Sequence, residues 1–119
     1  MRWTRAVLAV SVFVERPADI TGESFKNVKV PVQLWGSEHG GDGVTPESVA
    51  GVANELPGKP DFHVVPHSRH FAFLAPCPAD LTKSAPEICS DGPGFDRTAF
   101  HKEFDAEVLT FFRKHLVDV

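Results

Sequence analysis

Two short apolar runs separated by a helical pattern constrain the fold of this chain most strongly. The runs are VKVPVQLW at 28–35 and FHVV at 62–65. Both are rich in valine and aromatic residues, which favours β-strands. Strands that alternate with helices predict an α/β fold with a parallel sheet.

The helix between these runs has a recognisable start and one apolar side. Thr45 is suited to capping, Pro46 to the first helical position, and Glu47 to the positive end of the helix. The apolar positions follow at i, i+3, i+4 and i+7, and they are Val49, Val52, Ala53 and Leu56. Pro57-Gly58 then ends the predicted helix.

A third apolar run lies near the amino terminus, over 6–14. Two positive charges precede it, as in a signal peptide, but Glu15-Arg16-Pro17 follows at once without an A-x-A cleavage site. The run is also shorter than the about 20 residues that a membrane-spanning helix needs. We therefore interpret 5–14 as a buried parallel strand, apolar on both faces.

The carboxyl-terminal part is predicted to be irregular over 78–94, with one turn near 81–83, and then helical. Asp96 or Thr98 caps the last helix. Its apolar residues stand four apart, with Phe111 alongside: Phe100, Phe104, Val108, Phe112 and Leu116. Three strands make a thin sheet for an α/β fold, because an interior parallel strand expects neighbours on both sides. We expect one partial domain over 1–119.

Composition excludes some classes of partner. The 119 residues include 12 Lys and Arg and 16 Asp and Glu, which gives a net charge of −4. No basic block stands out, so binding to nucleic acid has no electrostatic support. We also expect no membrane partner and no cofactor.

Two segments together resemble the end of an α/β-hydrolase of the dienelactone-hydrolase-like family. In VPVQLWGSEHGGDGVTPESV, the residues Asp42 to Pro46 match the D-x-V-x-P pattern after the seventh strand of that fold. In FHVVPHSRHFAFLAPC, Arg69-His70-Phe71 matches the turn after its eighth strand, with Arg in place of the common Gly. The resemblance implies an α/β fold of about three parallel strands with flanking helices, the carboxyl-terminal part of such a hydrolase.

The resemblance implies roles for one acid and one histidine. His70 would be the general base, and Asp42 would bind its distal ring nitrogen and fix its tautomer. Glu38 is the alternative acid because it lies closer to the strand end, but the D-x-V-x-P match favours Asp42. Each residue also has a plain interpretation: Asp42-Gly43 is a strong turn pair, and His70 is a residue of an ordinary loop.

The nucleophile of that family is absent from this sequence. The G-x-S-x-G elbow precedes the acid and the histidine in chain order. None of the seven serines fits the pattern; Ser24 has Gly22 two residues before it but Lys26 two residues after it. We therefore expect a longer parent that acts on small esters or lactones, and a chain that is inactive alone.

Histidines and cysteines suggest two further sites. His63, His67 and His70 have an H-x3-H-x2-H spacing, but His63 lies on a strand and His67 in a loop, so we predict no metal site. Cys77 and Cys89 are either a disulfide, which implies an oxidising periplasmic or extracellular location, or two buried thiols in the cytoplasm. The sequence leaves these alternatives open.

A second hypothesis from another functional class is a non-catalytic module. The first strand is expected to leave an apolar sheet edge, and an exposed edge pairs with another chain. The sequence thus also predicts a homo-oligomer formed through that edge.

Overall fold

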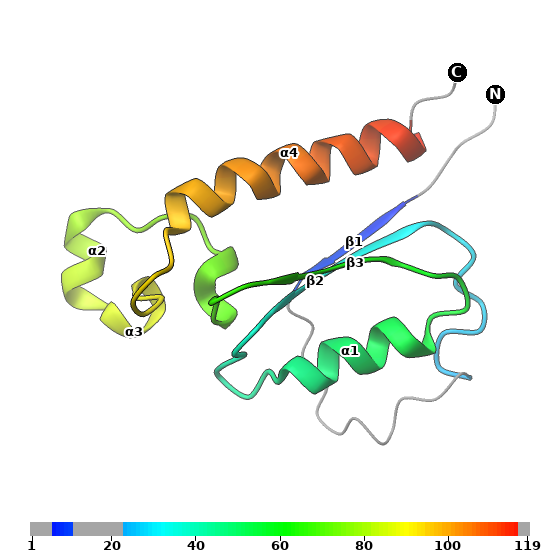
Figure 1. Cartoon of the computed structure of the whole chain (residues 1–119), viewed down its shortest axis with the longest axis horizontal. Helices are drawn as coiled ribbons and strands as arrows, with labels where there is room; N and C mark the ends of the chain where they lie inside the picture. Colours follow the sequence, from blue (N-terminus) through cyan, green and yellow to red (C-terminus); the bar gives the residue numbers. More distant parts are fainter. Residues whose placement is uncertain (1–5, 11–22, 117–119) are drawn as a thin grey trace.

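A three-stranded, all-parallel sheet forms the centre of the computed structural model, which describes residues 6–10 and 23–116 (Figure 1). The strands are β1 (Val7–Val10), β2 (Val32–Ser37) and β3 (Asp61–Val65). Their order in the sheet is β1-β2-β3, so β2 pairs on both sides. The predicted α/β fold with three parallel strands and flanking helices is confirmed.

The observed strand limits differ from the predicted ones for local reasons. β2 begins after Pro31 and not at Val28, since proline has no N–H to give to a neighbouring strand; its carbonyl oxygen instead accepts from Val7 N at 3.0 Å. β2 also continues through Gly36, where a Cβ would lie 3.1 Å from Val49 of the following helix. β1 lies inside the predicted strand at 5–14, whose positions 5 and 11–14 fall outside the described residues.

Helix α1 (Pro46–Glu55) packs against one face of the sheet (Figure 1). The Thr45 side chain accepts a hydrogen bond from Ser48 N at 3.1 Å, as its predicted capping role requires. Leu34 of β2 is fully buried under this helix, in a cluster with Val44, Val49 and Val52. The predicted apolar stripe of the helix is therefore the stripe that forms the core on this face.

Helix α4 (Arg97–Leu116) lies on the opposite face of the sheet. Asp96 caps it, since Asp96 Oδ1 accepts from Ala99 N at 3.1 Å. Trp35, Val65 and Phe100 form the buried cluster beneath it. Within 6–10 and 23–116, no helix combines the length and the apolar character that crossing a membrane requires.

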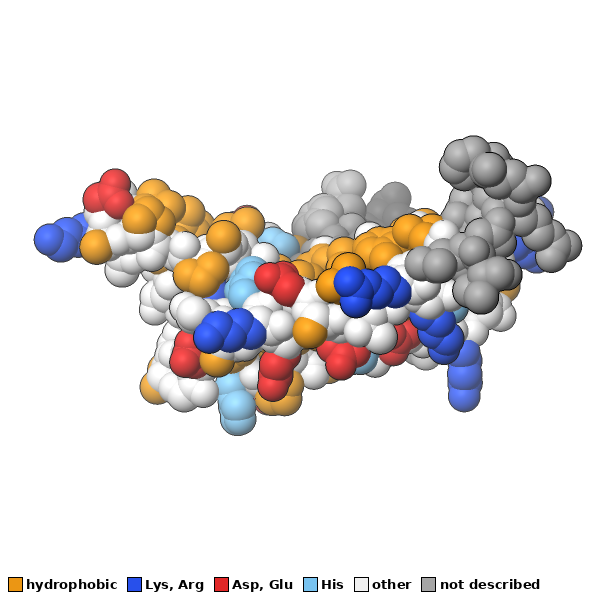
Figure 2. Space-filling view, turned by 90° about the horizontal axis from the view of Figure 1, so that it is seen from above, with side chains coloured by type: hydrophobic (Ala, Val, Ile, Leu, Met, Phe, Trp, Pro, Cys, Tyr) orange, Lys and Arg blue, Asp and Glu red, His pale blue; other side chains and the backbone are white. Residues whose placement is uncertain are grey.

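The predicted apolar stripe of α4 is correct only in its first half. Phe100 is buried, and so is Phe111, which was expected alongside the stripe, but Leu116 is 45% exposed. A helix turns about 100° per residue, so four steps of four residues rotate the side chain about 160° away from Phe100, whereas Phe111 lies within about 20° of it. The stripe thus leaves the core and reaches the surface at Leu116, and Leu109 on the same helix is exposed as well. Figure 2, which views the molecule from the α4 side, shows hydrophobic side chains gathered in a band on this face.

The segment after β3 is more ordered than predicted. It contains a 3₁₀ turn, η2 (His70–Phe73), and two short helices, α2 (Ala79–Ser84) and α3 (Pro86–Cys89). The predicted turn at 81–83 lies inside α2, but the prediction of an otherwise irregular region over 78–94 is wrong. A disulfide between Cys77 and Cys89 closes the segment, which decides between the two alternatives for these cysteines.

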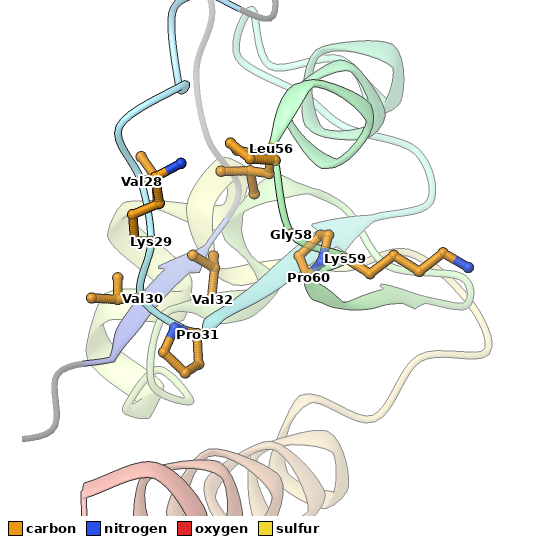
Figure 3. A pocket seen from close by; sticks show the side chains of 10 residues that line it. Val28, Lys29, Val30, Pro31, Val32, Leu56, Gly58, Lys59 and Pro60 are labelled. Carbon is orange, nitrogen blue, oxygen red and sulfur yellow. The ribbon is translucent and has the colours of Figure 1, made fainter.

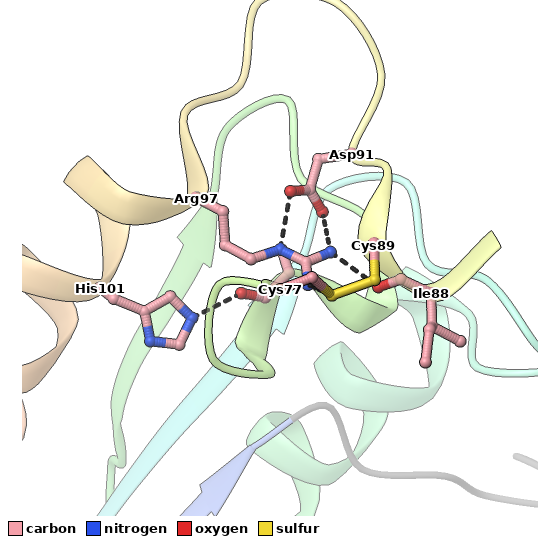
Figure 4. A network of polar contacts seen from close by, with 7 residues as sticks. Cys77, Ile88, Cys89, Asp91, Arg97 and His101 are labelled. Carbon is pink, nitrogen blue, oxygen red and sulfur yellow. Dashed lines mark hydrogen bonds and ion pairs between the residues drawn. A yellow bond between two sulfur atoms is a disulfide. The ribbon is translucent and has the colours of Figure 1, made fainter. Parts of the chain in front are cut away.

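A buried arginine anchors this closed segment to the start of α4 (Figure 4). Arg97 donates from Nε and Nη2 to the two carboxylate oxygens of Asp91, at 2.8 and 2.7 Å. Its Nη2 also donates to the carbonyl oxygen of Ile88 at 2.9 Å. Nearby, His101 Nε2 lies 2.8 Å from the carbonyl oxygen of Ala72 and ties η2 to α4. These contacts fix the segment 74–96 beside the loop that carries His70.

Candidate active site

Two loops meet at the carboxyl ends of β2 and β3, and they carry the predicted acid and histidine. The loop after β2 contains Asp42, and the loop after β3 contains His70 at the start of η2. His70 N donates a hydrogen bond to the carbonyl oxygen of Gly40 at 2.8 Å. A Cβ on Gly41 would lie 3.6 Å from the Cβ of His70, so the main chain next to Asp42 is in contact with the histidine.

Asp42 stands at the tip of a tight turn. Gly41 and Val44 exchange two backbone hydrogen bonds, of 2.8 and 2.9 Å, and Asp42 has a φ of 49°. A positive φ is uncommon for residues other than glycine, although aspartate tolerates it well. The side chain of Asp42 is exposed, and it makes no hydrogen bond or ion pair to the His70 imidazole among the described residues. The structure thus brings the main chains of the two loops together without a bond between the two side chains.

Glu38, the alternative acid, is bonded to the main chain of the second loop. Its Oε2 accepts from His67 N at 2.7 Å. This hydrogen bond holds the pKa of Glu38 below its ordinary value; loss of solvation opposes it, and the nearby His39 and His67 aid it. Glu38 therefore acts as a tie between the two loops.

Two buried serines, which sequence reasoning missed, reinforce the same junction. Ser37 Oγ accepts from Gly40 N at 3.0 Å. Ser68 is fully buried, donates to Val65 O at 2.7 Å, and accepts from His39 N through its carbonyl oxygen at 3.0 Å. Both serines use their polar groups to hold the loops in place, which is a structural role. In the sequence, the only indication of this role was a small polar residue near the end of each of two strands.

A polar network on the α4 face of the sheet was also not predicted. Trp35 Nε1 donates to Gln33 Oε1 at 2.9 Å, and Gln33 Nε2 donates to Asp61 Oδ2 at 2.9 Å. His63 stacks on Trp35 with ring centroids 4.2 Å apart. The buried Nε2 of His63 lies 2.9 Å from Asp61 Oδ1, which is within ion-pair distance. The angles at this contact do not meet those of a hydrogen bond.

The network lowers the pKa of Asp61. Partial burial is the largest single effect and acts to raise this pKa, but the hydrogen bond from Gln33, the contact with His63 and weaker electrostatic effects together outweigh it. Electrostatic interactions with His63 and Lys114 add to the lowering. Asp61 is therefore an ionised partner of the strand histidine.

The histidines do not converge in the way that the H-x3-H-x2-H spacing suggests. His63 is held against Trp35 on the sheet, whereas His67 lies in the loop with a φ of 62°. His67 instead joins Glu38 and His39, and one ligand atom from each of these three residues lies within 4.8 Å of the others. Among the described residues, these three side chains are the group whose nitrogen and oxygen atoms are close enough together to bind one metal ion.

Three cavities among the described residues lie away from the candidate site. One, of about 410 Å³, lies at the amino ends of β2 and β3, between the segments 28–32 and 56–60 (Figure 3). Two grooves of about 460 and 500 Å³ lie between β3 and α4. None of these three is lined by Asp42 or His70. The first contains only lysines as charged groups, so we give it no catalytic role.

Comparison of the chain with protein-family models, with curated proteins and with solved structures gave no match in any of the three.

Proposed function

We propose that this chain carries the acid and the base of a serine-hydrolase site for small esters or lactones. His70 is the general base, and Asp42 orients it. The observation that carries the proposal is the junction of the two loops, where His70 N donates to Gly40 O and Gly41 lies against His70. The acid and the histidine thus follow neighbouring parallel strands, the order that the resemblance to dienelactone hydrolases implies.

The nucleophile would come from a segment outside this sequence. In the proposed reaction a serine hydroxyl attacks the ester carbonyl while His70 Nε2 takes its proton. Asp42 accepts the Nδ1–H of the imidazole, which sets the tautomer and stabilises the imidazolium that forms. His70 then returns the proton to the leaving alcohol, and water releases the acyl group by the same steps in reverse order.

The contacts of Glu38 support Asp42 as the acid. The Glu38 carboxylate accepts the His67 N–H through Oε2, and its Oε1 lies 3.8 Å from His39 Nε2, so both oxygens face residues other than His70. Asp42 lies two residues from the carbonyl that His70 binds, and its exposed side chain is able to rotate.

Hydrolysis of p-nitrophenyl acetate by the purified chain tests the assignment of the nucleophile to another segment. We expect a rate no higher than that of the His70→Ala chain, because the chain offers no activated serine. Clear turnover that disappears in His70→Ala would contradict this part of the proposal and would require a nucleophile within these residues.

A second candidate function is a non-catalytic module that self-associates through β1. β1 is an outer strand of the described sheet, and Val7 on it is 45% exposed. Leu109 and Leu116 expose 49% and 45% of their surface on α4. An outer strand beside apolar surface favours pairing with a second copy.

Sedimentation velocity across a range of concentrations tests this second candidate. We expect a dimer that dissociates on dilution and that Val7→Lys weakens, since a charge on an outer strand opposes strand pairing. Lys29→Glu, a charge change on an exposed loop residue, is the control. A chain that stays monomeric at every concentration would exclude self-association.

A further inference from the structure

We propose that Glu38, His39 and His67 form a binding site for a divalent transition-metal ion, with Zn²⁺ as the best-suited ion. Glu38 and His39 belong to the loop after β2, and His67 belongs to the loop after β3. One carboxylate oxygen and one nitrogen from each imidazole lie within 4.8 Å of one another. The bound ion would clamp the two loops together.

The donor set matches the chemistry of zinc. Zn²⁺ binds imidazole nitrogen and carboxylate oxygen at about 2.0–2.2 Å, which places tetrahedral ligands about 3.3 Å apart. His39 Nε2 is already 3.8 Å from Glu38 Oε1. All three side chains are exposed, so small rotations of their χ angles bring the donors to ligand distance without moving the core. The fourth ligand would be water.

The main chain that supports these side chains is fixed without a metal. Glu38 N donates to Val65 O at 3.3 Å, and His39 N donates to Ser68 O at 3.0 Å. Glu38 uses Oε2 to hold His67 N, while its Oε1 faces His39. The ligands are thus presented from two anchored loops, and Glu38 has one oxygen for the protein and one for the ion.

Competing soft ligands are absent from the described residues. Both cysteines are in the disulfide, so no thiolate competes for the ion there. Two imidazoles with one carboxylate suit Zn²⁺, Ni²⁺ or Co²⁺ better than Mg²⁺ or Ca²⁺, which prefer oxygen ligands alone. Zn²⁺ should therefore bind and Mg²⁺ should not.

Isothermal titration of the metal-stripped chain, with its disulfide intact, tests the site. We expect one Zn²⁺ per chain with a Kd in the micromolar range, together with a melting temperature raised by a few degrees. His39→Ala and His67→Ala should each weaken binding by at least about tenfold. His115→Ala, which removes a histidine that packs on Phe111 in α4, is the matched control and should leave the Kd unchanged.

Glu38→Gln separates ligation from folding. The glutamine carbonyl oxygen still accepts from His67 N, so the loops stay tied, but the anionic ligand is lost. We expect weaker Zn²⁺ binding with an unchanged circular dichroism spectrum. The proposal is overturned by no binding at up to about 1 mM Zn²⁺. It is equally overturned by binding that survives in the His39→Ala and His67→Ala chains. These readouts measure the metal alone, so they stand apart from any esterase activity.

Discussion

His70 donates its backbone N–H to the carbonyl oxygen of Gly40 at 2.8 Å, and this hydrogen bond joins the loop after β3 to the loop after β2. The bond crosses between two neighbouring parallel strands at their carboxyl ends, where the sites of open α/β sheets lie. His70 is thereby bonded to Gly40, which precedes Asp42 by two positions in the chain. The candidate acid and base are therefore neighbours because of a main-chain contact.

The first prediction concerns the glycine in this contact. Gly40 has a φ of 66°, and a Cβ there would overlap the carbonyl oxygen of Val44. Gly40→Ala should lower the free energy of unfolding by at least about 2 kcal/mol, because both the backbone strain and the overlap must be relieved. Urea denaturation of the two chains measures the difference.

A glycine in α1 provides the matched control for Gly40→Ala. A Cβ on Gly51 would meet nothing within 4 Å. Gly51→Ala should raise the free energy of unfolding by about 0.5–1 kcal/mol, since alanine favours a helix interior. Equal effects at the two glycines would show that the turn at Gly40 is not as tight as described.

The second prediction concerns the buried pair Arg97 and Asp91, each of whose side chains is 6% exposed. Arg97→Ala should cost about 3–5 kcal/mol of stability, because it leaves the Asp91 carboxylate buried without its partner. Arg113→Ala, at an exposed position of the same helix, should change stability by less than about 0.5 kcal/mol. Denaturation of both variants measures this, and a small loss for Arg97→Ala would mean that Asp91 reaches solvent.

The third prediction concerns the pH dependence that Asp61 contributes. Its pKa is lower in the folded chain, so the unfolded chain binds more protons near that pKa and stability rises with pH there. The contribution is complete above the unfolded pKa of about 3.9 and is lost as the pH falls through the lower folded value. Because the Asp61 side chain is 50% exposed, we expect no more than about 1 kcal/mol.

Asp61→Asn measures this contribution directly. The variant should be less stable than the natural chain at pH 7, and the difference should shrink as the solution is acidified below about pH 4. Asp105→Asn, on the exposed side of α4, should leave stability unchanged at both pH values. A difference that grows on acidification would reverse the sign and contradict the description of the network.

The sequence was informative where one local signal decides the structure. The Thr45 cap and the stripe of α1 were predicted because both depend on residues within one helix. The exposure of Leu116 was not, because a four-residue spacing drifts around a helix of this length. Helix periodicity has to be followed turn by turn to detect this.

Contacts between residues far apart in the sequence were not predictable from the spacing of residue types. The bond from His67 N to Glu38 and the stacking of His63 on Trp35 join residues about 30 positions apart. Their pairing depends on the register of β2 against β3, which the sequence pattern does not specify to one residue. For the same reason the cluster of Glu38, His39 and His67 appears only in the folded chain.

The tautomer of the His70 imidazole tests the central claim, that Asp42 orients His70 as a catalytic base. Long-range ¹H–¹⁵N NMR distinguishes the Nδ1–H form from the Nε2–H form. We expect the exposed Asp42 side chain to rotate onto the imidazole in solution, so that the Nδ1–H form predominates at neutral pH, loses its predominance in Asp42→Asn and persists in Glu38→Gln. A His70 tautomer that is the same in the natural chain and in Asp42→Asn, or that changes only in Glu38→Gln, would contradict the account.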